Sequence, residues 1–510
     1  MQRTIDPFRE DSFDLLILGG GITGAGIALD AVLRGFRVGL IDKGDFASGT
    51  SSASSKLIHG GLRYLEHGGF HLVYEALHER GLLLENGPHL VHPLSFVIPF
   101  YHDARVPPWK YRLGLTLYDL LAGRSNLRRS RPLTRSSLRR SFPHLRSTGL
   151  RGGARYVDAQ MDDARLCLEV VRTAALHGAC VANYVEALDF EQRSGAIAGI
   201  RAVDRVGGLE FSIRARQIVN ATGPWLDHVC RLAGDDSGPL LDPTKGVHLI
   251  APDQGLTQAF LLLHPADGRV FFVIPWLGKT LIGTTDTHWK QSPDTLMVAD
   301  ADIDYTLAGY NRYFVPPLER SDILGSFAGL RPLIRARSGE PSSLSREFQL
   351  FSSPSGLLSV AGGKYTTYRH MAEVVTNAVA RRLGRRRRCR TRHFRLHGAP
   401  DETWETFEPA AISALCAHDG LTESSARHLI RRYGRCALDV ASYLEQDPAL
   451  AEPVVVGEPD LRAELLYQRD QEMAIYPADH LLRRTRLGLF RPELLSTALP
   501  MGEAARALFP

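Results

Sequence analysis

A glycine-rich motif near the N-terminus has the spacing of a phosphate-binding turn. The apolar run Asp14–Leu18 is followed by Gly19-Gly20-Gly21-Ile22-Thr23-Gly24, which fits the pattern G-x-G-x-x-G. In this pattern the first glycine allows a tight turn, the second lets the backbone approach a pyrophosphate, and the third lets a helix pack closely on a strand. Asp42 ends the next apolar run, and its carboxylate suits hydrogen bonds from the ribose hydroxyls of a bound adenosine. The motif and the acid together predict dinucleotide binding.

Three later segments bear on which dinucleotide is bound. The loop from Gly49 to Lys56 is rich in small hydroxyl side chains, which flavoproteins often place against the pyrophosphate and ribityl chain. The tetrapeptide Asn220–Gly223 ends a late strand, where the chain of many flavoproteins returns to the dinucleotide. The run Leu358–Lys364 ends in two glycines before a predicted helix, whose positive end stabilises negative charge on a reduced flavin ring. These segments favour FAD over NAD.

An α/β scaffold is needed to bring these residues together. Short apolar runs over 14–18 and 36–41 predict buried strands, and the periodicity of 22–34 predicts a helix between them. Further strands are expected around 195–222 and over 270–275, 280–283 and 357–361, and further helices over 71–86, 162–177 and about 367–383. Beyond about residue 400 the pattern is helical throughout. The sequence therefore predicts an α/β region followed by a helical domain.

Several motifs closely resemble those of the FAD-dependent, quinone-linked glycerol-3-phosphate dehydrogenases. The most specific is Ser51–Glu66, which contains His59-Gly60-Gly61-Leu62-Arg63-Tyr64. The other motifs with this resemblance are Asn220–Trp225, Ile282–Asp286, Gly329–Leu333, Gly362–Arg369 and Arg483–Gly488. The resemblance covers about residues 14–490. The sequence departs from the family pattern at Asp42, where a glutamate is common, at Tyr365, where an apolar residue is common, and in the more basic stretch 334–343.

The resemblance implies a discontinuous fold. A Rossmann-type FAD-binding domain is interleaved with an antiparallel-sheet substrate domain within residues 14–385. The FAD-binding segments are expected at about 14–75, 150–240 and 345–385, and the substrate-domain segments at about 76–149 and 241–344. A C-terminal helical domain is expected over 400–510.

The resemblance also implies an activity. Members of the family oxidise sn-glycerol 3-phosphate to dihydroxyacetone phosphate, pass a hydride from C2 to N5 of FAD, and deliver two electrons to a membrane quinone. The FAD is expected to be non-covalent, because no histidine or cysteine lies in an obvious flavinylation motif. Arginine suits the phosphate because its planar fork matches the phosphate oxygens. The substrate-binding residues implied are Arg63, Tyr64, Arg331, Arg346 and Lys364.

The catalytic residues implied are His59, Arg331 and Lys364. A neutral imidazole acts as a general base near pH 7, but a flavin contact is an equally open role for His59. The FAD contacts implied are Gly19, Gly20, Gly21, Ile22, Thr23, Gly24, Asp42, Lys43, Thr50, Ser51, Ser52, Ser55, Lys56, His59, Gly60, Ala221, Thr222, Gly223, Gly363 and Lys364.

Two alternative functions stay open at this point. One is another FAD-dependent oxidase or dehydrogenase of the same superfamily that acts on an amine or a 2-hydroxy acid. The other is a catalytically silent, membrane-associated flavoprotein. A phosphate-binding role for Arg331 distinguishes glycerol 3-phosphate oxidation from the first alternative. Reduction of the flavin by glycerol 3-phosphate distinguishes it from the second.

Positive charge is concentrated in two stretches, residues 105–146 and 385–393. The first also carries aromatic residues, among them Trp109, Tyr111 and Tyr118. A solvated basic face and contact with anionic lipid head groups are the two main interpretations, since each cation near such a surface contributes about 1 kcal/mol. Nucleic-acid binding is not expected, because no nucleic-acid-binding motif accompanies the charge. The second stretch is interpreted as a solvated linker, with a further membrane contact as the alternative.

Composition limits the remaining choices. The chain has 510 residues, 44% of them hydrophobic and 23% charged, which excludes wholesale disorder. Its six cysteines are scattered, and none has CxxC spacing, so neither a metal site nor a disulfide framework is expected. No apolar run is long enough for a signal sequence or a membrane span. The expected location is the cytoplasmic face of the membrane, as a peripheral protein, with a homodimer as a further expectation.

Overall fold

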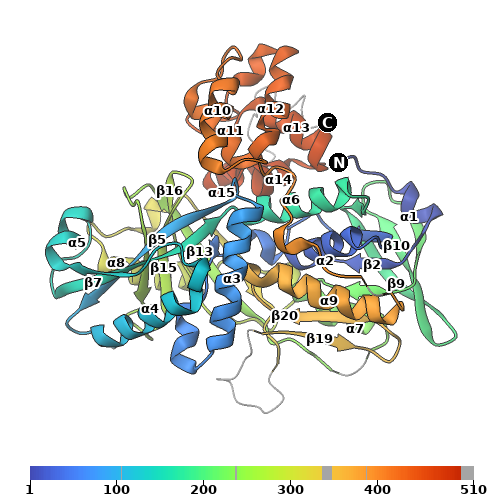
Figure 1. Ribbon diagram of the computed structural model, residues 1–510, viewed down its shortest axis with the longest axis horizontal. Coiled ribbons are helices and arrows are strands. Elements are labelled where there is room, and N and C mark those ends of the chain that lie inside the picture. The colour runs from blue at the N-terminus through green and yellow to red at the C-terminus, as the bar shows by residue number, and fades with distance from the viewer. Residues whose placement is uncertain (105, 236–237, 336–346, 386, 496–510) are drawn as a thin grey trace.

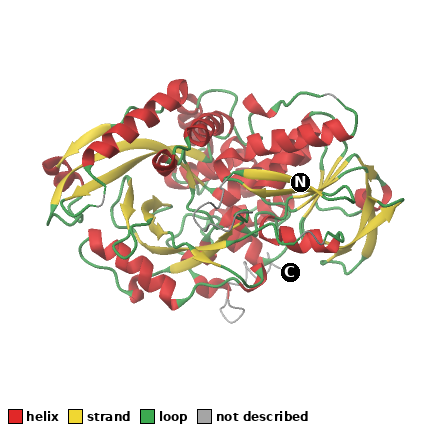
Figure 2. Ribbon diagram, turned by 90° about the horizontal axis from the view of Figure 1, so that it is seen from below, coloured by secondary structure: helices red, strands yellow, loops and turns green. Residues whose placement is uncertain are grey.

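The computed structural model describes residues 1–104, 106–235, 238–335, 347–385 and 387–495. Three parts are evident in Figure 1: a sheet-based part at the right, a second sheet-based part at the left, and a group of helices above them. Figure 2 shows the two strand-rich parts at opposite ends of the long axis. The fold is α/β with a C-terminal helical region, as the sequence predicts.

The first part is built on a six-stranded sheet. Its strands, in spatial order, are β19 (Phe348–Ser352), β20 (Leu358–Gly362), β12 (Ile218–Asn220), β2 (Leu15–Leu18), β3 (Val38–Ile41) and β8 (Cys180–Ala182). All neighbouring pairs are parallel except β19 with β20. The strands come from distant segments of the chain, so this dinucleotide-binding part is discontinuous.

Both faces of this sheet are covered. Helices α2 (Ile22–Leu33), α6 (Asp163–Leu176) and α9 (Tyr368–Arg382) share one apolar core with Leu15, Ile17 and Leu40 of the sheet. A four-stranded sheet packs on the opposite face. Its strands are β1 (Ser12–Phe13), β11 (Glu210–Ala215), β10 (Ala196–Asp204) and β9 (Val185–Arg193). The predicted βαβ unit, the N-capped helix after Asp162 and the helix after Lys364 are all confirmed.

The second part is a largely antiparallel ten-stranded sheet. Its main path is β17 (Thr287–His288), β13 (Thr244–Pro252), β16 (Lys279–Gly283), β15 (Val270–Trp276), β14 (Ala259–Leu263), β5 (Val91–Tyr101), β7 (Leu150–Met161) and β4 (Leu57–Ile58). Two strands lie off this path, β18 (Gly325–Arg331) beside β13 and β6 (Arg131–Thr134) beside β7. Helices α3 (Phe70–Asn86) and α4 (Pro108–Ala122) share a core with one face, and α5 (Arg135–Ser141) and α8 (Asp300–Tyr313) share a core with the other.

The third part is helical and has a core of its own. It contains α10 (Trp404–Leu415), α11 (Glu423–Tyr433), α12 (Ala437–Ala441), α13 (Arg462–Glu472), α14 (Pro477–Asp479) and α15 (Leu487–Phe490). The ring of Phe490 packs edge-on against Trp276 of the ten-stranded sheet, with ring centroids 5.4 Å apart. Arg165 of α6 and Glu472 of α13 form two hydrogen bonds, of 2.6 and 2.8 Å, and both side chains are fully buried. The helical domain is therefore packed firmly on both sheet-based parts.

Candidate active site

A cavity of about 650 Å³ lies between the two sheet-based parts. One wall is made by the carboxyl ends of the parallel strands β2, β3, β12 and β20, and the opposite wall by residues of β13 and β18. In an open α/β sheet the crevice beyond the carboxyl ends of the strands is the usual ligand site. The cavity therefore lies where the predicted cofactor and substrate residues should meet.

The glycine turn has the geometry that its sequence predicts. Gly19 has φ +106°, and an added Cβ there would lie 2.7 Å from the carbonyl oxygen of Ala221. A Cβ on Gly24 would lie 1.9 Å from the carbonyl oxygen of Gly19, so α2 packs against the turn at a distance that only glycine allows. Gly19, Gly21 and Thr23 line the cavity. The amide end of α2 therefore faces the space that a pyrophosphate needs.

Asp42 is tied to this turn. Its Oδ2 accepts a 2.7 Å hydrogen bond from the Gly20 amide, and its Oδ1 accepts one of 2.9 Å from the Gly44 amide. Burial raises the pKa of Asp42 to about 6, against the lowering effect of these two hydrogen bonds. The carboxyl group lines the cavity. It is thus placed to accept hydrogen bonds from hydroxyl groups of a bound ligand.

The hydroxyl-rich loop connects the two walls of the cavity. Ser51 Oγ accepts a 2.9 Å hydrogen bond from the amide of Ile22, the first residue of α2. Thr50 Oγ1 donates to the carbonyl oxygen of Leu330 at 2.7 Å. Ser55 Oγ lies 2.9 Å from Nε2 of His248. The loop therefore joins the glycine turn to strands β18 and β13.

Three predicted substrate residues meet at the cavity: Arg331, Lys364 and Tyr64. Arg331 ends β18, with Nη1 3.0 Å from Asp286 Oδ1 and Nη2 3.1 Å from Thr284 Oγ1. Lys364 Nζ lies 3.8 Å from the centre of the Tyr64 ring. The cavity lining thus includes a guanidinium and an ammonium group, which suit an anionic ligand.

His59 also lines the cavity, directly after β4. Its ring is packed edge-on against Phe272, with centroids 6.3 Å apart, and its amide donates to Thr366 Oγ1 at 3.3 Å. The next residue, Gly60, donates its amide to the Tyr118 hydroxyl at 2.8 Å, and Tyr118 donates to Asp158. Tyr118 is thus a buried support of the His59 loop, and its place among aromatics of the basic stretch does not make it a surface residue.

His248 is a residue of the cavity wall that the sequence interpretation missed. It is buried in β13, where burial and the nearby Lys56 and Arg331 cations hold its pKa well below the usual range. The imidazole is stacked on Phe327, with ring centroids 5.0 Å apart. The signal available was a lone histidine in an otherwise apolar strand, and such a pattern alone does not distinguish a core residue from a cavity residue.

Most of the predicted cofactor residues meet at the cavity. Those that line it are Gly19, Gly21, Ile22, Thr23, Asp42, Lys43, Thr50, Ser51, Ser55, His59, Ala221, Thr222, Gly223, Gly363 and Lys364. Gly20, Gly24 and Gly60 support the lining from behind through the contacts above. Ser52 does not line the cavity, and its hydroxyl donates to the carbonyl oxygen of Gly49.

Two further predicted residues, Lys56 and Arg63, do not line the cavity, and a third lies outside the described residues. Lys56 is fully buried behind the loop, where its Nζ lies 2.8 Å from both carboxylate oxygens of Asp163. Arg63 is exposed and does not line the cavity. Arg346 lies outside the described residues. Among the described residues, the predicted anion-binding cations that line the cavity are Arg331 and Lys364.

The cavity residues fit FAD. Close backbone approach at Gly19 and Gly24 leaves the amide end of α2 open to two phosphates, and Asp42 suits a ribose. At the other end, Gly362 and Gly363 have φ +74° and +91° and precede helix α9, so that amides and a helix dipole face the cavity. Such a dipole stabilises negative charge on a reduced flavin.

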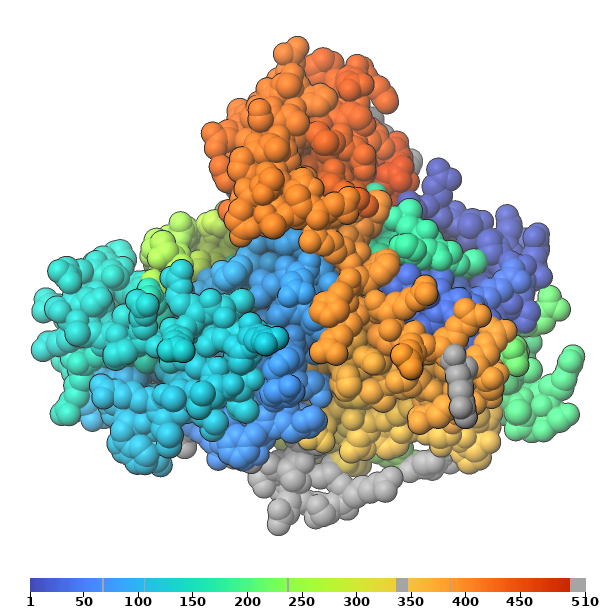
Figure 3. Space-filling view, viewed as in Figure 1, coloured from blue at the N-terminus to red at the C-terminus, as the bar shows by residue number. Residues whose placement is uncertain are grey.

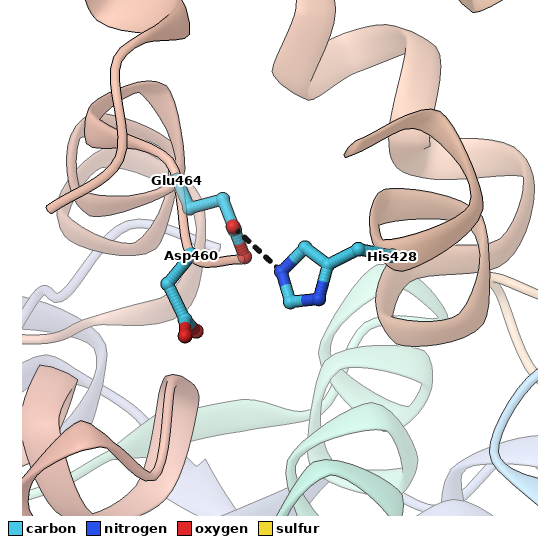
Figure 4. Close-up of side chains that lie close together, drawn as sticks. All are labelled: His428, Asp460 and Glu464. Carbon is cyan, nitrogen blue, oxygen red and sulfur yellow. Dashed lines mark hydrogen bonds and ion pairs between the residues drawn. The ribbon is translucent and has the colours of Figure 1, made fainter. Parts of the chain in front are cut away.

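One further cluster of potential metal ligands occurs among the described residues, and it lies in the helical domain (Figure 4). His428 Nε2 is 2.9 Å from Glu464 Oε1, with Asp460 beside them. Arg432 Nη1 pairs with both carboxylates and is 2.7 Å from Glu464 Oε2. A guanidinium thus already pairs with both acids, and the cluster is an ion-pair network inside the helical domain.

Comparison with known proteins gives a consistent result. Residues 14–369 match the family "FAD dependent oxidoreductase", and residues 389–502 match the "C-terminal domain of alpha-glycerophosphate oxidase". The aerobic glycerol-3-phosphate dehydrogenase of Staphylococcus epidermidis is 36% identical over 94% of this chain and 87% of that protein. The human mitochondrial glycerol-3-phosphate dehydrogenase is 37% identical over 96% of this chain and 69% of that protein.

A solved structure agrees over nearly the whole chain. The glycerol-3-phosphate dehydrogenase from Bacillus halodurans, complexed with FAD, superposes with a TM-score of 0.80 and 34% identity, covering 96% of this chain and 89% of that one. The chain accordingly uses FAD, and the cavity is where most of the residues predicted to contact FAD meet. The chain belongs to the family of FAD-dependent glycerol-3-phosphate dehydrogenases.

Proposed function

We propose that the chain oxidises sn-glycerol 3-phosphate to dihydroxyacetone phosphate and that its electrons pass to a membrane quinone. The observation that carries this proposal is that two cations, Arg331 at the end of β18 and Lys364 after β20, line the same cavity as His59. Relatives of 36–38% identity named as glycerol-3-phosphate dehydrogenases support the choice of substrate. Two cations suit a phosphate dianion better than they suit an amine.

Arg331 anchors the phosphate in this proposal. Its guanidinium is held by Asp286, Thr284 and the carbonyl oxygen of Thr285, at distances of 3.0, 3.1 and 3.2 Å. A guanidinium fixed before the substrate arrives loses less conformational freedom on binding. Lys364 adds a second cation, and the Tyr64 ring below it restricts the position of the ammonium group.

His59 receives the proton of the C2 hydroxyl. The loop that carries it is fixed by the Gly60–Tyr118 hydrogen bond, which limits the places that the imidazole can occupy. FAD, when bound, supplies the acceptor for the C2 hydride. Neutral His248 lies deeper in the wall and contributes a polar atom to it without a charge.

Anaerobic addition of glycerol 3-phosphate to the yellow protein tests the proposal. We expect bleaching of the flavin with saturation in substrate, and little peroxide when air is admitted. His59→Gln should retain FAD and slow flavin reduction at least tenfold. A yellow protein that glycerol 3-phosphate does not bleach at any concentration contradicts the proposal, and an unchanged rate in His59→Gln removes that residue from the proton transfer.

The membrane part of the proposal is supported by surface chemistry. Helix α4 exposes Trp109, Leu113 and Leu120, and the neighbouring start of α3 exposes Phe70 and Tyr74. Exposed arginines accompany them, namely Arg112, Arg124, Arg128 and Arg129. Aromatic and aliphatic groups next to cations suit the interface of an anionic bilayer. The protein then lies peripherally on the cytoplasmic face, close to quinone.

Among the described residues, none of the helices combines the length and the hydropathy that crossing a bilayer requires. A homodimer and the domain limits 14–385 and 400–510 stay predictions. Purification in detergent followed by light scattering tests the oligomeric state, and limited proteolysis tests the limits.

A further inference from the structure

Three arginines at the end of the helical domain reach into the FAD-binding part. Arg483, Arg484 and Arg486 follow one another just before α15, and the side chains of Arg484 and Arg486 are fully buried. Arg483 also pairs with Asp479, and Arg484 with Glu472, both of the helical domain, but the other acids that these arginines contact are Asp45, Asp162 and Asp163. A buried charge of this kind is tolerated only where its partners are placed well.

Asp163 connects Arg486 to the hydroxyl-rich loop. Its Oδ1 lies 3.1 Å from Arg486 Nη2, and both its carboxylate oxygens lie 2.8 Å from Lys56 Nζ. Its Oδ2 accepts hydrogen bonds from the Ser54 amide at 3.1 Å and the Ser54 hydroxyl at 2.8 Å. Ser54 lines the cavity together with its neighbour Ser55. One carboxylate therefore couples a C-terminal guanidinium to the cavity wall.

Asp45 makes a second connection. Arg484 Nη2 donates to Asp45 Oδ1 at 3.0 Å, and Arg483 Nε donates to Oδ2 at 2.5 Å. Asp45 belongs to the turn after Asp42, in which the Gly44 amide donates to Asp42. Lys43 and Gly44 of this turn line the cavity. The arginines thus contact the supports of both loops that face the predicted cofactor position.

The backbone shows that this arrangement is maintained against local strain. Arg486 has φ +79°, and Lys56, at the other end of the Asp163 connection, has φ +59°. Residues other than glycine adopt such values only where surrounding contacts compensate for the steric cost. Both residues are fully buried and make their ion pairs with the same carboxylate. The position of the Asp163 carboxylate is therefore fixed by Arg486 on one side and by Lys56 on the other.

We propose that Arg486 is a positioning residue of the FAD site, and that the C-terminal helical domain completes this site through Asp163 and the loop Ser54–Lys56. The inference rests on the proposed placement of FAD in the cavity. Arg486 contacts neither cofactor nor substrate. Its effect is transmitted through Asp163, Lys56 and Ser54 to the wall that includes Ser55 and His248.

The experiment measures the FAD dissociation constant of apoprotein by flavin fluorescence, at a temperature where circular dichroism shows each variant to be folded. Arg486→Met removes the charge and keeps an unbranched apolar stem, and Arg486→Lys keeps the charge but loses the planar guanidinium. Glu464→Gln is the matched control, because Glu464 is fully buried in an ion cluster of the same domain and contacts Arg432 and His428 rather than the cavity loops (Figure 4).

We expect the dissociation constant to rise at least tenfold in Arg486→Met and at least threefold in Arg486→Lys, with a shifted visible absorption band of the bound flavin. Glu464→Gln should lower the melting temperature but keep FAD affinity within twofold. The inference is overturned if folded Arg486→Met binds FAD within twofold of the parent chain. Should Arg486→Met not fold, Arg486→Lys decides by the same twofold limit. A parent chain that binds FAD but is not bleached by glycerol 3-phosphate contradicts the proposed function alone.

Discussion

At the scale of single residues, Arg331 is the phosphate anchor that the proposed function requires. Asp286 Oδ1 lies 3.0 Å from its Nη1 and holds the guanidinium in place. Because the phosphate is remote from C2, the loss of either contact should weaken binding more than it slows the chemical step. We expect Arg331→Lys to raise KM for glycerol 3-phosphate at least thirtyfold. Asp286→Asn should raise this KM threefold to tenfold and change kcat less than threefold. Steady-state kinetics with a soluble dye as acceptor measures both.

The matched control for Arg331 is plain glycerol, which lacks the phosphate. Turnover of glycerol should respond little to Arg331→Lys. An equal loss for both substrates shows that Arg331 serves the fold or the flavin instead of the phosphate.

Asp42 predicts a pH dependence of cofactor binding. Its pKa in the apoprotein is raised from 3.8 to about 6, so its contribution to apoprotein stability is full below pH 3.8 and is lost as pH rises through about 6. Ribose hydroxyls donate to the ionised form, so FAD binding should release a proton. We expect FAD affinity to rise about tenfold between pH 5 and pH 7 and then to level off, as measured by flavin fluorescence. Asp42→Asn should bind FAD more weakly and show a flat profile over this range. A parent chain with equal affinities at the two pH values refutes the assignment.

Positions of single residues are predictable from the sequence where a motif fixes the backbone. Gly19, Gly21 and Asp42 line the cavity as their spacing predicts, because the turn between two strands is a local structure. Lys56 belongs to the same loop, but its side chain turns to Asp163, which is far along the chain, and no local pattern encodes that choice. His248 was missed for the same reason, since its partner Ser55 comes from a distant segment.

At the scale of elements, the contact between α2 and the glycine turn decides whether the cofactor framework forms. An alanine at Gly24 places its Cβ 1.9 Å from the Gly19 carbonyl oxygen, so helix and strand must separate. We expect Gly24→Ala to lower the free energy of unfolding by about 3 kcal/mol or more and to abolish FAD retention. Gly114→Ala in α4 is the control, since nothing lies within 4 Å of the added Cβ. It should raise stability by about 0.5–1 kcal/mol. Urea unfolding measures both, and a Gly24→Ala protein that retains FAD disproves the packing argument.

Elements with strong periodicity were predicted well. The strands β2, β3 and β20 and the helices α2 and α9 lie within a few residues of the expected positions. Their order in the sheet was not derivable from periodicity, because β12 lies between β2 and β20 although about two hundred residues separate it from β2. That order rests on nonlocal hydrophobic packing, and only the family resemblance supplied the interleaved topology.

At the scale of the whole molecule, many charges form ion pairs between domains, and the small net charge gives no sign of them. The formal charge of +5 is small, but several arginines are buried against acids of another part, as in the Arg165–Glu472 pair. Within the stretch 385–393, which is interpreted as a solvated linker, Arg385 pairs with Asp14 of the FAD-binding part at 2.7 Å, while Arg387, Arg388, Arg390 and Arg392 are exposed. On the surface around α4, exposed cations adjoin exposed apolar side chains.

This surface leads to a prediction about membrane docking. In Figure 3 the chain around α4 lies at the lower left of the molecule, and the helical domain lies at the top. Cations act over a Debye length of about 8 Å at physiological salt, whereas apolar side chains must insert. We expect a larger fraction of the protein to float with anionic vesicles than with neutral vesicles. In the double variant Trp109→Ser/Leu113→Ser, the fraction that floats with anionic vesicles should fall at least fivefold. Val456→Ser is the control, because Val456 is 90% exposed but belongs to the helical domain.

The kinetic readout separates docking from catalysis. The double variant should reduce a soluble dye at the parent rate, because Trp109 and Leu113 do not line the cavity. Its rate with quinone embedded in vesicles should fall in proportion to the lost binding, since only docked molecules reach the acceptor. If the double variant floats as well as the parent chain, α4 is not the docking surface. If it floats poorly but reduces embedded quinone at the parent rate, then delivery of electrons does not depend on this contact.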